Sequence, residues 1–472
     1  MAKLFVFGIG GTGARVIRSL TMLLASGLKL KNIDQVVPIL IDPDKANGDL
    51  NRTRELLEMY QKIKKETGGY DTKQGFFNHS IVAVNQLGSE GDSPQFGMNA
   101  MDNADMKFRE YIDLNNMSEA NQQLTQLLFS RRNLESDMSI GFKGNPNMGS
   151  VALNSMAQTA YYRDFVNKYQ KGDKIFIISS IFGGTGSSGF PVLLRNLRNE
   201  SHEISGSQNV KNAHISAVSL LPYFSTDHHG DSEVNSRTFL GKTKAALKYY
   251  KKNLLNNGSL DTLYLLGDQS ENTYEHHEGK KEQQNNAHFL ELAAVGAIVD
   301  FTRNNASQQN NTIIKEFGVK TKNPKLGVPD LGEAMQTDIL SPIVNFSILC
   351  NFNKHSLTTC LNSRAAWVHA RHGVNKPFFD SPFYKENLVN FFNAFNGWLK
   401  ELENNQVSFS PFDHRLSPNK LIGGNGLPSL STNELVASLN KNVKKPGTGN
   451  LNEHFLELFH RSINDSVTSK QQ

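Results

Sequence analysis

The sequence predicts an α/β fold with a Rossmann-like parallel sheet. Two apolar runs, Lys3 to Phe7 and a second that starts at Phe176, each lead straight into a glycine-rich turn. A helical pattern follows each turn, at Ala14 to Ala25 and at Phe190 to Leu197. Strand, turn and helix in this order form a βαβ unit, and such units build parallel sheets. Three further apolar runs add strands to this prediction: Val36 to Ile41, Ala213 to Leu221 and Leu260 to Leu266.

The second glycine turn is the stretch around which the chain is organised. Between Phe182 and Gly189, four of the eight residues are glycine and three carry hydroxyl groups. Glycines let backbone N–H groups approach a phosphate closely, and the following helix N-terminus adds roughly half a positive charge. The alternative is a tight turn that merely needs glycine, which leaves the hydroxyl groups unexplained. We therefore predict phosphate binding by five residues of this turn: Gly183, Gly184, Thr185, Gly186 and Ser187.

The first glycine turn, Gly8 to Gly13, has the spacing G-x-G-x-x-G after a strand. This spacing is typical of dinucleotide-binding folds, in which an acidic residue after the next strand hydrogen-bonds a ribose. Asp42 and Asp44 occupy that place. Taken alone, the pattern fits a nicotinamide or flavin enzyme almost as well as another nucleotide-binding protein. The residues predicted to meet the nucleotide in this turn are Gly10, Gly11 and Thr12.

The bulk properties favour a soluble, cytoplasmic protein. Its 472 residues are enough for two or three domains. The net charge of +5, from 50 basic and 45 acidic residues, is too small and dispersed to predict nucleic-acid binding. Cys350 and Cys360 lack metal-type spacing and fit structural thiols in a reducing compartment. No stretch approaches the roughly 20 apolar residues of a membrane span, and no signal peptide is recognisable, so we expect no membrane partner.

A polar region separates the second predicted strand from the central one. We interpret residues 46–139 as an inserted helical region without evident chemistry. A third glycine-bearing loop, Gly141 to Gly149, follows it and includes Gly144 and Asn145. This loop precedes the helix that leads into the strand at Phe176.

No metal site is predicted. His228 and His229 stand between two aspartates, but a solvated loop is favoured because their spacing matches no known ligand set. Glu233 and Arg237 follow, one turn apart on the same face of the next predicted helix.

The last part of the chain begins with a predicted central helix over residues 285–303. Its apolar run, Phe289 to Phe301, includes four small residues that let other elements pack closely. The Asn- and Gln-rich stretch Thr302 to Thr312 marks a domain boundary. Beyond it, strand-like runs such as Ile343 to Leu349 alternate with helices, and a terminal amphipathic helix follows. We therefore expect three parts: a nucleotide-binding domain over 1–284, a core helix over 285–303 and a C-terminal α+β domain over 313–472.

In their order along the chain, these motifs resemble those of the tubulin/FtsZ superfamily of GTP-binding, filament-forming proteins. The turn from Phe182 to Gly189 looks like the family signature G-G-G-T-G-[ST]-G, with Phe182 and Ser188 at two usual glycine positions. The turn from Gly8 to Gly13 is similar to the first glycine loop of FtsZ, with Arg15 where FtsZ usually has asparagine, so the resemblance implies that Arg15 also meets the nucleotide. The resemblance spans roughly residues 1 to 305.

The resemblance assigns further residues to the nucleotide. The segment Gly144-Asn145-Pro146 looks like the [AG]-N-P-x-x-G of FtsZ, whose backbone meets the γ-phosphate. Glu233 and Arg237 repeat the E-x-x-x-R spacing of the ribose-contacting segment, and Asn286 stands where the family contacts the guanine base. These matches imply GTP or GDP, with Mg²⁺, as the bound ligand, and a smaller α+β second domain.

The resemblance also implies self-assembly into a head-to-tail filament, with GTP hydrolysis completed between adjacent subunits. In the family, acidic residues just after the core helix position water in the next subunit's site. The N-x-D-F-x-D of FtsZ corresponds here to residues 298–303, which keep the first acid as Asp300 and have Arg303 in place of the second. Asp300 is therefore the predicted catalytic residue; capping the helix or pairing with Arg303 are its alternative roles. Glu291, earlier in the helix, is interpreted as structural.

Three functions remain open from the sequence. The first is a divergent bacterial or phage-type filament protein that hydrolyses GTP. The second is a nucleotide-gated interaction or signalling subunit that assembles with protein partners of the same system and hydrolyses little or no GTP. It is favoured by the altered acidic loop and by the insertion. The third is an NAD-dependent enzyme that uses Gly8 to Gly13 and Asp42, but it leaves the second glycine turn idle.

Overall fold

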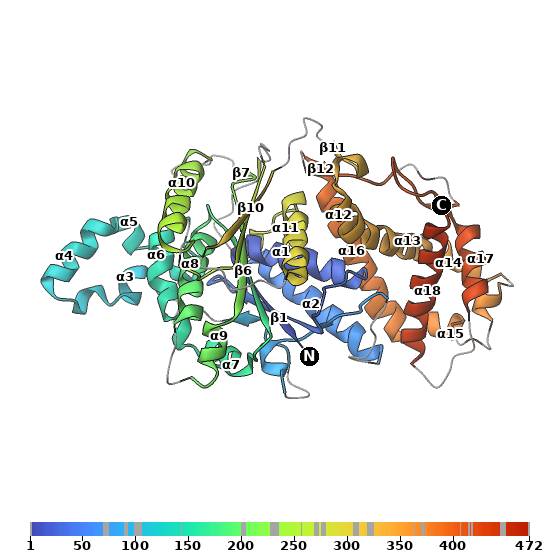
Figure 1. Cartoon of the computed structure of the whole chain (residues 1–472), viewed down its shortest axis with the longest axis horizontal. Coiled ribbons are helices and arrows are strands. Elements are labelled where there is room, and N and C mark those ends of the chain that lie inside the picture. Colours follow the sequence, from blue (N-terminus) through green and yellow to red (C-terminus); the bar gives the residue numbers. More distant parts are fainter. Residues whose placement is uncertain are drawn as a thin grey trace.

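A computed structural model of the chain describes most of its residues (Figure 1). The pair His228-His229 and Glu233 lie outside the described residues, as does the side chain of Arg237. The described ranges are 2–68, 75–88, 93–98, 106–142, 144–199, 204–226, 236–255, 257–268, 273–274, 280–304, 311–318, 325–363, 365–369, 372, 374–405, 407–413, 416, 419–443 and 450–470.

One large parallel sheet forms the centre of the N-terminal half. It contains eight strands in the order β10-β8-β6-β5-β1-β2-β3, with β4 also paired to β2. Every pair within it is parallel. The predicted α/β fold with a Rossmann-like parallel sheet is therefore confirmed. The strands are β1 (Lys3–Ile9), β2 (Gln35–Ile41), β3 (Ser80–Ile81), β4 (Gly97–Met98), β5 (Lys174–Ser180), β6 (His214–Leu220), β8 (Thr262–Gly267) and β10 (Ile313–Gly318).

The sheet grows in two directions from β1. The chain first adds β2 on one side of β1, and later places β5, β6, β8 and β10 in turn on the other side. Helices α1 (Gly10–Ala25) and α2 (Gly48–Glu66) lie on one face of the sheet, whereas α8 (Gly184–Arg198) and α10 (Ser236–Asn253) lie on the other (Figure 1). This doubly wound arrangement has its topological switch point between β1 and β5.

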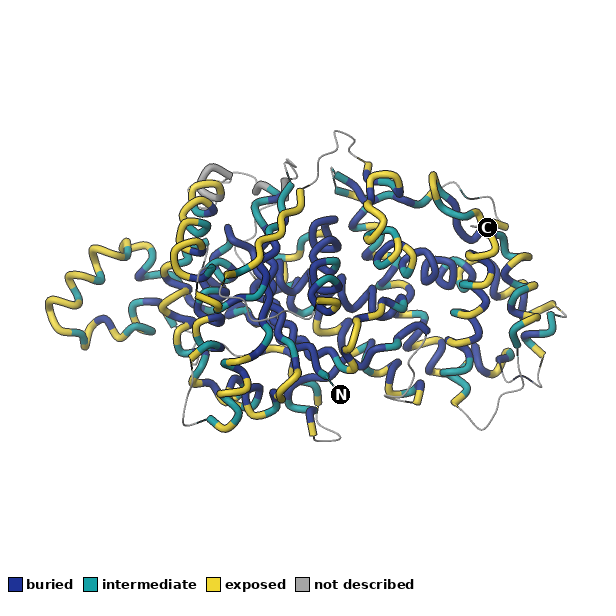
Figure 2. The backbone as a smooth tube through the Cα atoms, in the orientation of Figure 1, coloured by how far each residue is buried: buried dark blue, intermediate teal, exposed yellow. Residues whose placement is uncertain are grey.

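Burial explains the strong signals of the first strand and helix. Every residue of β1 is buried, as a continuous apolar run between two helical layers predicts (Figure 2). All residues of α1 except Gly11 are buried too, because α1 lies between the sheet, α2 and a central helix, α11. Asn47 caps the N-terminus of α2, because its side chain accepts the backbone N–H groups of Asp49 and Leu50.

The region expected as one helical insertion, 46–139, divides into two parts. Its first part belongs to the sheet domain, since α2 packs on α1 and both β3 and β4 pair with β2. Residues 106–139, here called the arm, project from the body (Figure 1). A β-bridge between Lys107 and Asp137 closes the arm at its base. The arm contains α3 (Phe108–Tyr111), α4 (Glu119–Leu128) and α5 (Arg131–Leu134).

The central helix α11 (Phe289–Arg303) stands between the sheet and the C-terminal helices (Figure 1). All of its residues are buried except Gly296, Asp300 and Arg303. The strand β10 follows it and pairs with β8, although the sequence placed residues 313–318 in the C-terminal domain. The sheet domain therefore takes a strand from beyond the expected boundary.

The C-terminal part is mainly helical. The run Ile343 to Leu349, predicted as a strand, lies within α13 (Ser341–His355); that prediction is wrong because α13 is buried nearly all round and loses its helical period. Among the residues described there, the strands form two short pairs, β11 (Lys325–Leu326) with β12 (Ser408–Phe409) and β13 (Lys420–Ile422) with β14 (Leu430–Ser431). The remaining elements are α6 (Pro146–Ala152), α7 (Ala160–Lys168), α9 (Ser207–Lys211), α12 (Glu333–Met335), α14 (Leu357–Leu361), α15 (Lys376–Phe379), α16 (Val389–Glu403), α17 (Thr432–Asn442), α18 (Leu451–Thr468), β7 (Ser225–Thr226) and β9 (Thr273–Tyr274).

Candidate functional site

The first and second glycine turns lie in contact at the carboxyl edge of the sheet. The parallel register sets Gly8 of β1 opposite Ile178 of β5, so both strands end at this edge. A Cβ atom placed on Gly10 would lie 3.6 Å from Thr185 Cβ and 3.7 Å from the backbone nitrogen of Gly186. The two turns therefore form one surface at the topological switch point, where open α/β sheets bind their ligands.

The third glycine loop packs against the second. A Cβ atom on Gly184 would lie 2.9 Å from the backbone nitrogen of Gly144 and 3.2 Å from its Cα, so only glycine fits there. Lys242 of α10 donates from Nζ to the carbonyl oxygen of Gly144 at 2.5 Å. The sequence did not single out Lys242, because lysines occur along the whole of α10 and their spacing carries no signal. Asn145 follows Gly144 and immediately precedes α6, without a side-chain hydrogen bond to the first turn of that helix.

Backbone N–H groups are the main donors of this surface. The helices α1 and α8 begin at Gly10 and Gly184 and run for 16 and 15 residues, so both positive ends meet at one edge. The Ser187 hydroxyl, predicted as a ligand group, donates instead to the carbonyl of Gly183 within the turn. Ser188 likewise donates to the carbonyl of Gly184 at 2.7 Å. These two hydroxyl protons are in use, whereas the first N–H groups of both helices have no partner inside their own helix.

Arg15, predicted to meet the nucleotide, is buried beneath the first glycine turn with 2% of its side chain exposed. Its Nε donates to Glu291 Oε1 at 2.5 Å, and Nη1 pairs with Asp49. Its Nη2 donates to the Tyr223 hydroxyl at 2.9 Å and to Thr12 Oγ1 at 3.3 Å. Burial alone would lower the pKa of Arg15, but Glu291, Tyr223 and Asp49 together raise it well above its ordinary value. All three guanidinium nitrogens are thus engaged by protein groups.

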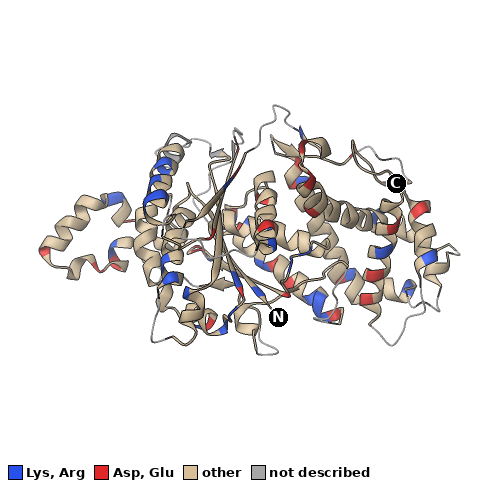
Figure 3. Cartoon of the chain, viewed as in Figure 1, with Lys and Arg blue, Asp and Glu red and all other residues tan. Residues whose placement is uncertain are grey.

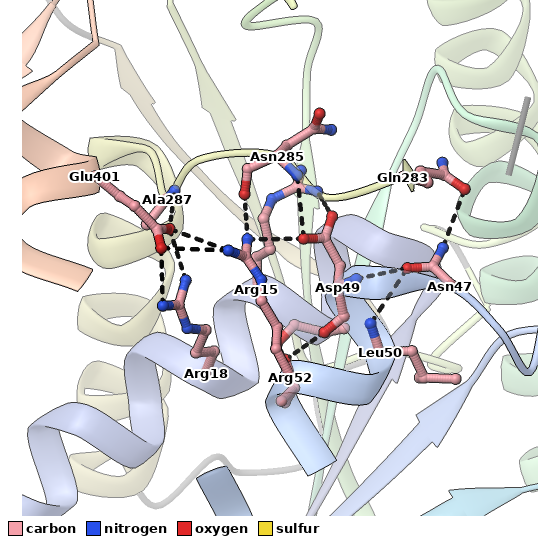
Figure 4. A network of polar contacts seen from close by, with 12 residues as sticks. Arg15, Arg18, Asn47, Asp49, Leu50, Arg52, Gln283, Asn285, Ala287 and Glu401 are labelled. Carbon is pink, nitrogen blue, oxygen red and sulfur yellow. Dashed lines mark hydrogen bonds and ion pairs between the residues drawn. The ribbon is translucent and has the colours of Figure 1, made fainter. Parts of the chain in front are cut away.

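This polar network extends to the C-terminal half (Figure 4). Asp49 also pairs with Arg52 at 2.7 Å, and Arg52 donates to both carboxylate oxygens of Glu401 on α16 at 3.3 Å. Glu401 accepts two further bonds from Arg18, at 2.6 and 2.9 Å. Burial alone would raise the pKa of Glu401, but Arg18 and Arg52 hold it below its ordinary value. A chain of alternating charges therefore joins the first glycine turn to α16.

Asp42 and Asp44 follow β2 at the same edge, as predicted from their place in the sequence. The amide nitrogen of Asn47 lies 3.5 Å from Asp42 Oδ2. Asp44 is buried and accepts the backbone N–H of Lys280 at 2.6 Å, which holds the segment before α11 against this edge. Burial raises the pKa of Asp42 to about 7, and the neighbouring charges on Asp44 and Asp49 act in the same direction.

Asn286, the predicted base contact, lies where the segment before α11 crosses the network. The N–H of Asn285 donates to Asp49 Oδ1 at 3.2 Å, and the N–H of Ala287 donates to Glu401 Oε2 at 2.9 Å. Asn286 is exposed between these two anchored neighbours. The structure thus brings Asn286 to the same side of the sheet as the glycine turns.

Asp300 lies at the opposite end of α11 from the glycine turns. Asp300 is the twelfth of the 15 residues of α11, so at 1.5 Å per residue it lies about 16 Å along the helix from Phe289, the first residue at the end nearer the glycine turns. Asp300 Oδ2 accepts the Tyr264 hydroxyl at 2.6 Å and pairs with Lys315 at 2.5 Å. Burial alone would raise the pKa of Asp300, but Lys315 and Tyr264 hold it below its ordinary value. The alternative pairing with Arg303 is wrong, because Arg303 pairs with Asp338 at 2.6 Å.

Comparisons with protein-family models and with curated proteins find no match. In the part of the chain that is described, no three His, Cys, Asp or Glu side chains gather as metal ligands. None of the helices described there has the length and apolar character that crossing a bilayer requires. Function must therefore be argued from the geometry and chemistry of the glycine-turn edge.

Proposed function

We propose that this chain is a tubulin/FtsZ-like protein that binds GTP or GDP, with Mg²⁺, at the glycine-turn edge and self-assembles into filaments. The observation that supports the proposal most strongly is that the second glycine turn contacts both of the others: Gly10 of the first turn lies against Thr185 and Gly186, and Gly184 lies against Gly144 of the third loop. Chain reversal alone does not require turns that are far apart in the sequence to lie in contact. Turns that direct N–H groups at one triphosphate must lie this close, and two long helices add their positive ends.

The position of Asp300 supports the head-to-tail arrangement. The glycine turns and Asp300 lie at opposite ends of α11, so a contact between unlike ends repeats and generates a filament. The Asp300 side chain is 40% exposed and can reach a neighbouring subunit. In such a filament Asp300 orients water toward the nucleotide of the next subunit, a role that glycine turns do not perform.

A second candidate function is a nucleotide-gated subunit that assembles with partner proteins of the same system and hydrolyses little or no GTP. The contacts of Asp300 favour it. A carboxylate held by both Lys315 and Tyr264 has a lowered pKa and a fixed orientation, which makes it a poor group for activating water. Turnover in the assembled state separates the two candidates.

Nucleotide titration tests the binding site. Calorimetry of the purified chain with GTP, ATP and NADH is expected to give the tightest binding with GTP. Gly10 has φ of +73°, so Gly10→Ala adds strain and a methyl group where the two turns meet, and GTP affinity should fall about tenfold or more. Gly397→Ala on α16 is the matched control, because a Cβ atom placed on Gly397 would meet no described atom within 4 Å. Binding of NADH in preference to GTP, or no nucleotide binding, refutes the proposal.

Light scattering and electron microscopy test assembly. Filaments should form with GTP or a non-hydrolysable analogue and not without nucleotide. Phosphate release that rises on assembly supports the filament-forming GTPase. Filaments or partner complexes without phosphate release support the second candidate instead.

A further inference from the structure

The helix α4 of the arm presents its apolar face to solvent. Leu124, Leu127 and Leu128 are 54%, 85% and 64% exposed, and their spacing places all three on one face of the helix. Large apolar side chains scattered singly on a surface need no explanation, but three on one face of a short helix indicate a contact surface.

The polar side of α4 is the side attached to the rest of the arm. Gln122 donates from Nε2 to the carbonyls of Asn115 and Met117 at 3.2 and 3.0 Å, and the Thr125 hydroxyl lies 3.7 Å from Met117 Sδ. No residue of α4 is buried. A surface helix of a monomer normally turns its apolar stripe inward, so α4 is inverted. A helix of 10 residues is marginal in water unless its apolar face packs against something.

The charges of the arm favour a reversed copy of the same helix as that partner. Near the base of the arm, Lys107 and Arg109 both pair with Glu135. Glu119, at the first position of α4, is the only charged residue of that helix (Figure 3), and Arg131 and Arg132 follow just beyond its other end; all three are exposed. An antiparallel pair of α4 helices therefore sets the acidic end of each copy beside the basic end of the other. A membrane-surface helix would instead need lysine or arginine on its polar face, where α4 has Gln, Thr and Asn.

We propose that the leucine face of α4 packs antiparallel against α4 of a second copy about a two-fold axis. The contact is isologous: Leu124 of each copy faces Leu127 and Leu128 of the other. The arm projects on the side of the molecule away from the C-terminal helices, so a contact through α4 does not involve α11 (Figure 1). The dimer contact is therefore separate from the nucleotide site and from the proposed filament contact, and it forms without nucleotide. It can join two filaments side by side.

Sedimentation of the full chain without nucleotide tests the contact. The wild type is expected to be a dimer whose mass depends on concentration. Leu127→Ser should raise the dimer dissociation constant about 100-fold or more, because the side chain lies at the centre of the contact in both copies. It removes no internal packing, since Leu127 is 85% exposed. Leu240→Ser on α10, where the side chain is 58% exposed, is the matched control and should leave the dimer unchanged.

Charge reversal tests the antiparallel order. Glu119→Arg and Arg131→Glu should each weaken the dimer, and the double variant should restore it, because each acidic end then meets a basic end again. A monomeric wild type, an identical mass for wild type and Leu127→Ser, or no rescue in the double variant overturns the proposal. Because no nucleotide is added, a failure of GTP binding would leave this result unchanged, so the two proposals fail separately.

Discussion

Replacing Arg15 by alanine is expected to destabilise the fold more than it weakens nucleotide binding. The side chain is buried and holds both Asp49 and Glu291. Without it, Glu291 keeps only the Tyr223 hydroxyl and the backbone N–H of His288 as partners. Two carboxylates would then lie under the first glycine turn without this counter-charge.

The size of the effect follows from the cost of an unpaired buried charge. Breaking a buried ion pair by removing one partner costs about 3–5 kcal/mol of folding free energy. Native domains are stable by roughly 5–15 kcal/mol, so Arg15→Ala should remove a large share of the free energy of unfolding. Removing both Arg15 and Glu291, as Arg15→Met with Glu291→Met, should cost less than the sum of the single changes, because fewer charges remain unpaired.

Denaturant unfolding of these variants measures the free energy of unfolding, and GTP titrations in parallel measure the affinity for GTP. Lys248→Ala, on the exposed face of α10, is the control and should stay within about 0.5 kcal/mol of the wild type. If Arg15→Ala instead keeps wild-type stability to within about 1 kcal/mol and loses GTP binding, Arg15 is a ligand contact. The structural role argued from its partners is then refuted.

Three further predictions concern the acidic residues Asp42, Glu401 and Asp300. Asp42 has a raised pKa of about 7, so the native state keeps a proton that the unfolded chain loses near pH 4; its stabilising contribution is full below about pH 4 and is lost as the pH rises through 7. Asp42→Asn should therefore have a higher free energy of unfolding than the wild type at pH 8, by up to about 4 kcal/mol at about 1.4 kcal/mol per pKa unit, and about the same free energy of unfolding near pH 4; equal stability of variant and wild type at pH 8 contradicts this. Glu401→Gln leaves Arg18 with a neutral partner and should lower the free energy of unfolding by about 1–3 kcal/mol in denaturant titrations. Asp300→Ala should lower the GTP turnover of the assembled protein about 100-fold at unchanged GTP affinity, whereas Lys315→Ala should raise the turnover. Phosphate release at the wild-type rate in both variants excludes Asp300 from hydrolysis.

The strands of the sheet could be predicted where a short stretch of sequence carries the signal, such as an apolar run that ends in glycines. The strands β1 and β5 are buried on both faces, so their apolar runs and the glycines that end them stand out in the sequence. The strand β10 gave no such signal: all six of its residues are exposed, and only pairing with β8 makes it a strand. The run Ile343 to Leu349 misled because a helix buried nearly all round shows no helical period.

The site was predictable only in its backbone. Glycine turns at the ends of strands are visible in the sequence, but the partners of Arg15 are 34 and 276 residues away. Glu401 meets Arg18 across 383 residues, and in the sequence it is one more charged residue on a helix. The role of Glu291 as a structural residue was expected from its place in a buried helix, and its contacts with Arg15 and Tyr223 agree with that role.

The charge balance of the network explains why its arginines are not expected to form the proposed nucleotide site. Three arginines alternate with three carboxylates beneath the first glycine turn and along its extension to α16, and their charges sum to zero. Such a network fixes the positions of α1, α2, α11 and α16 but supplies little net attraction for a triphosphate. In the proposed function, the attraction for a triphosphate therefore comes from the N–H groups of the turns and from the N-termini of α1 and α8. The members of the network are Arg15, Arg18, Arg52, Asp49, Glu291 and Glu401.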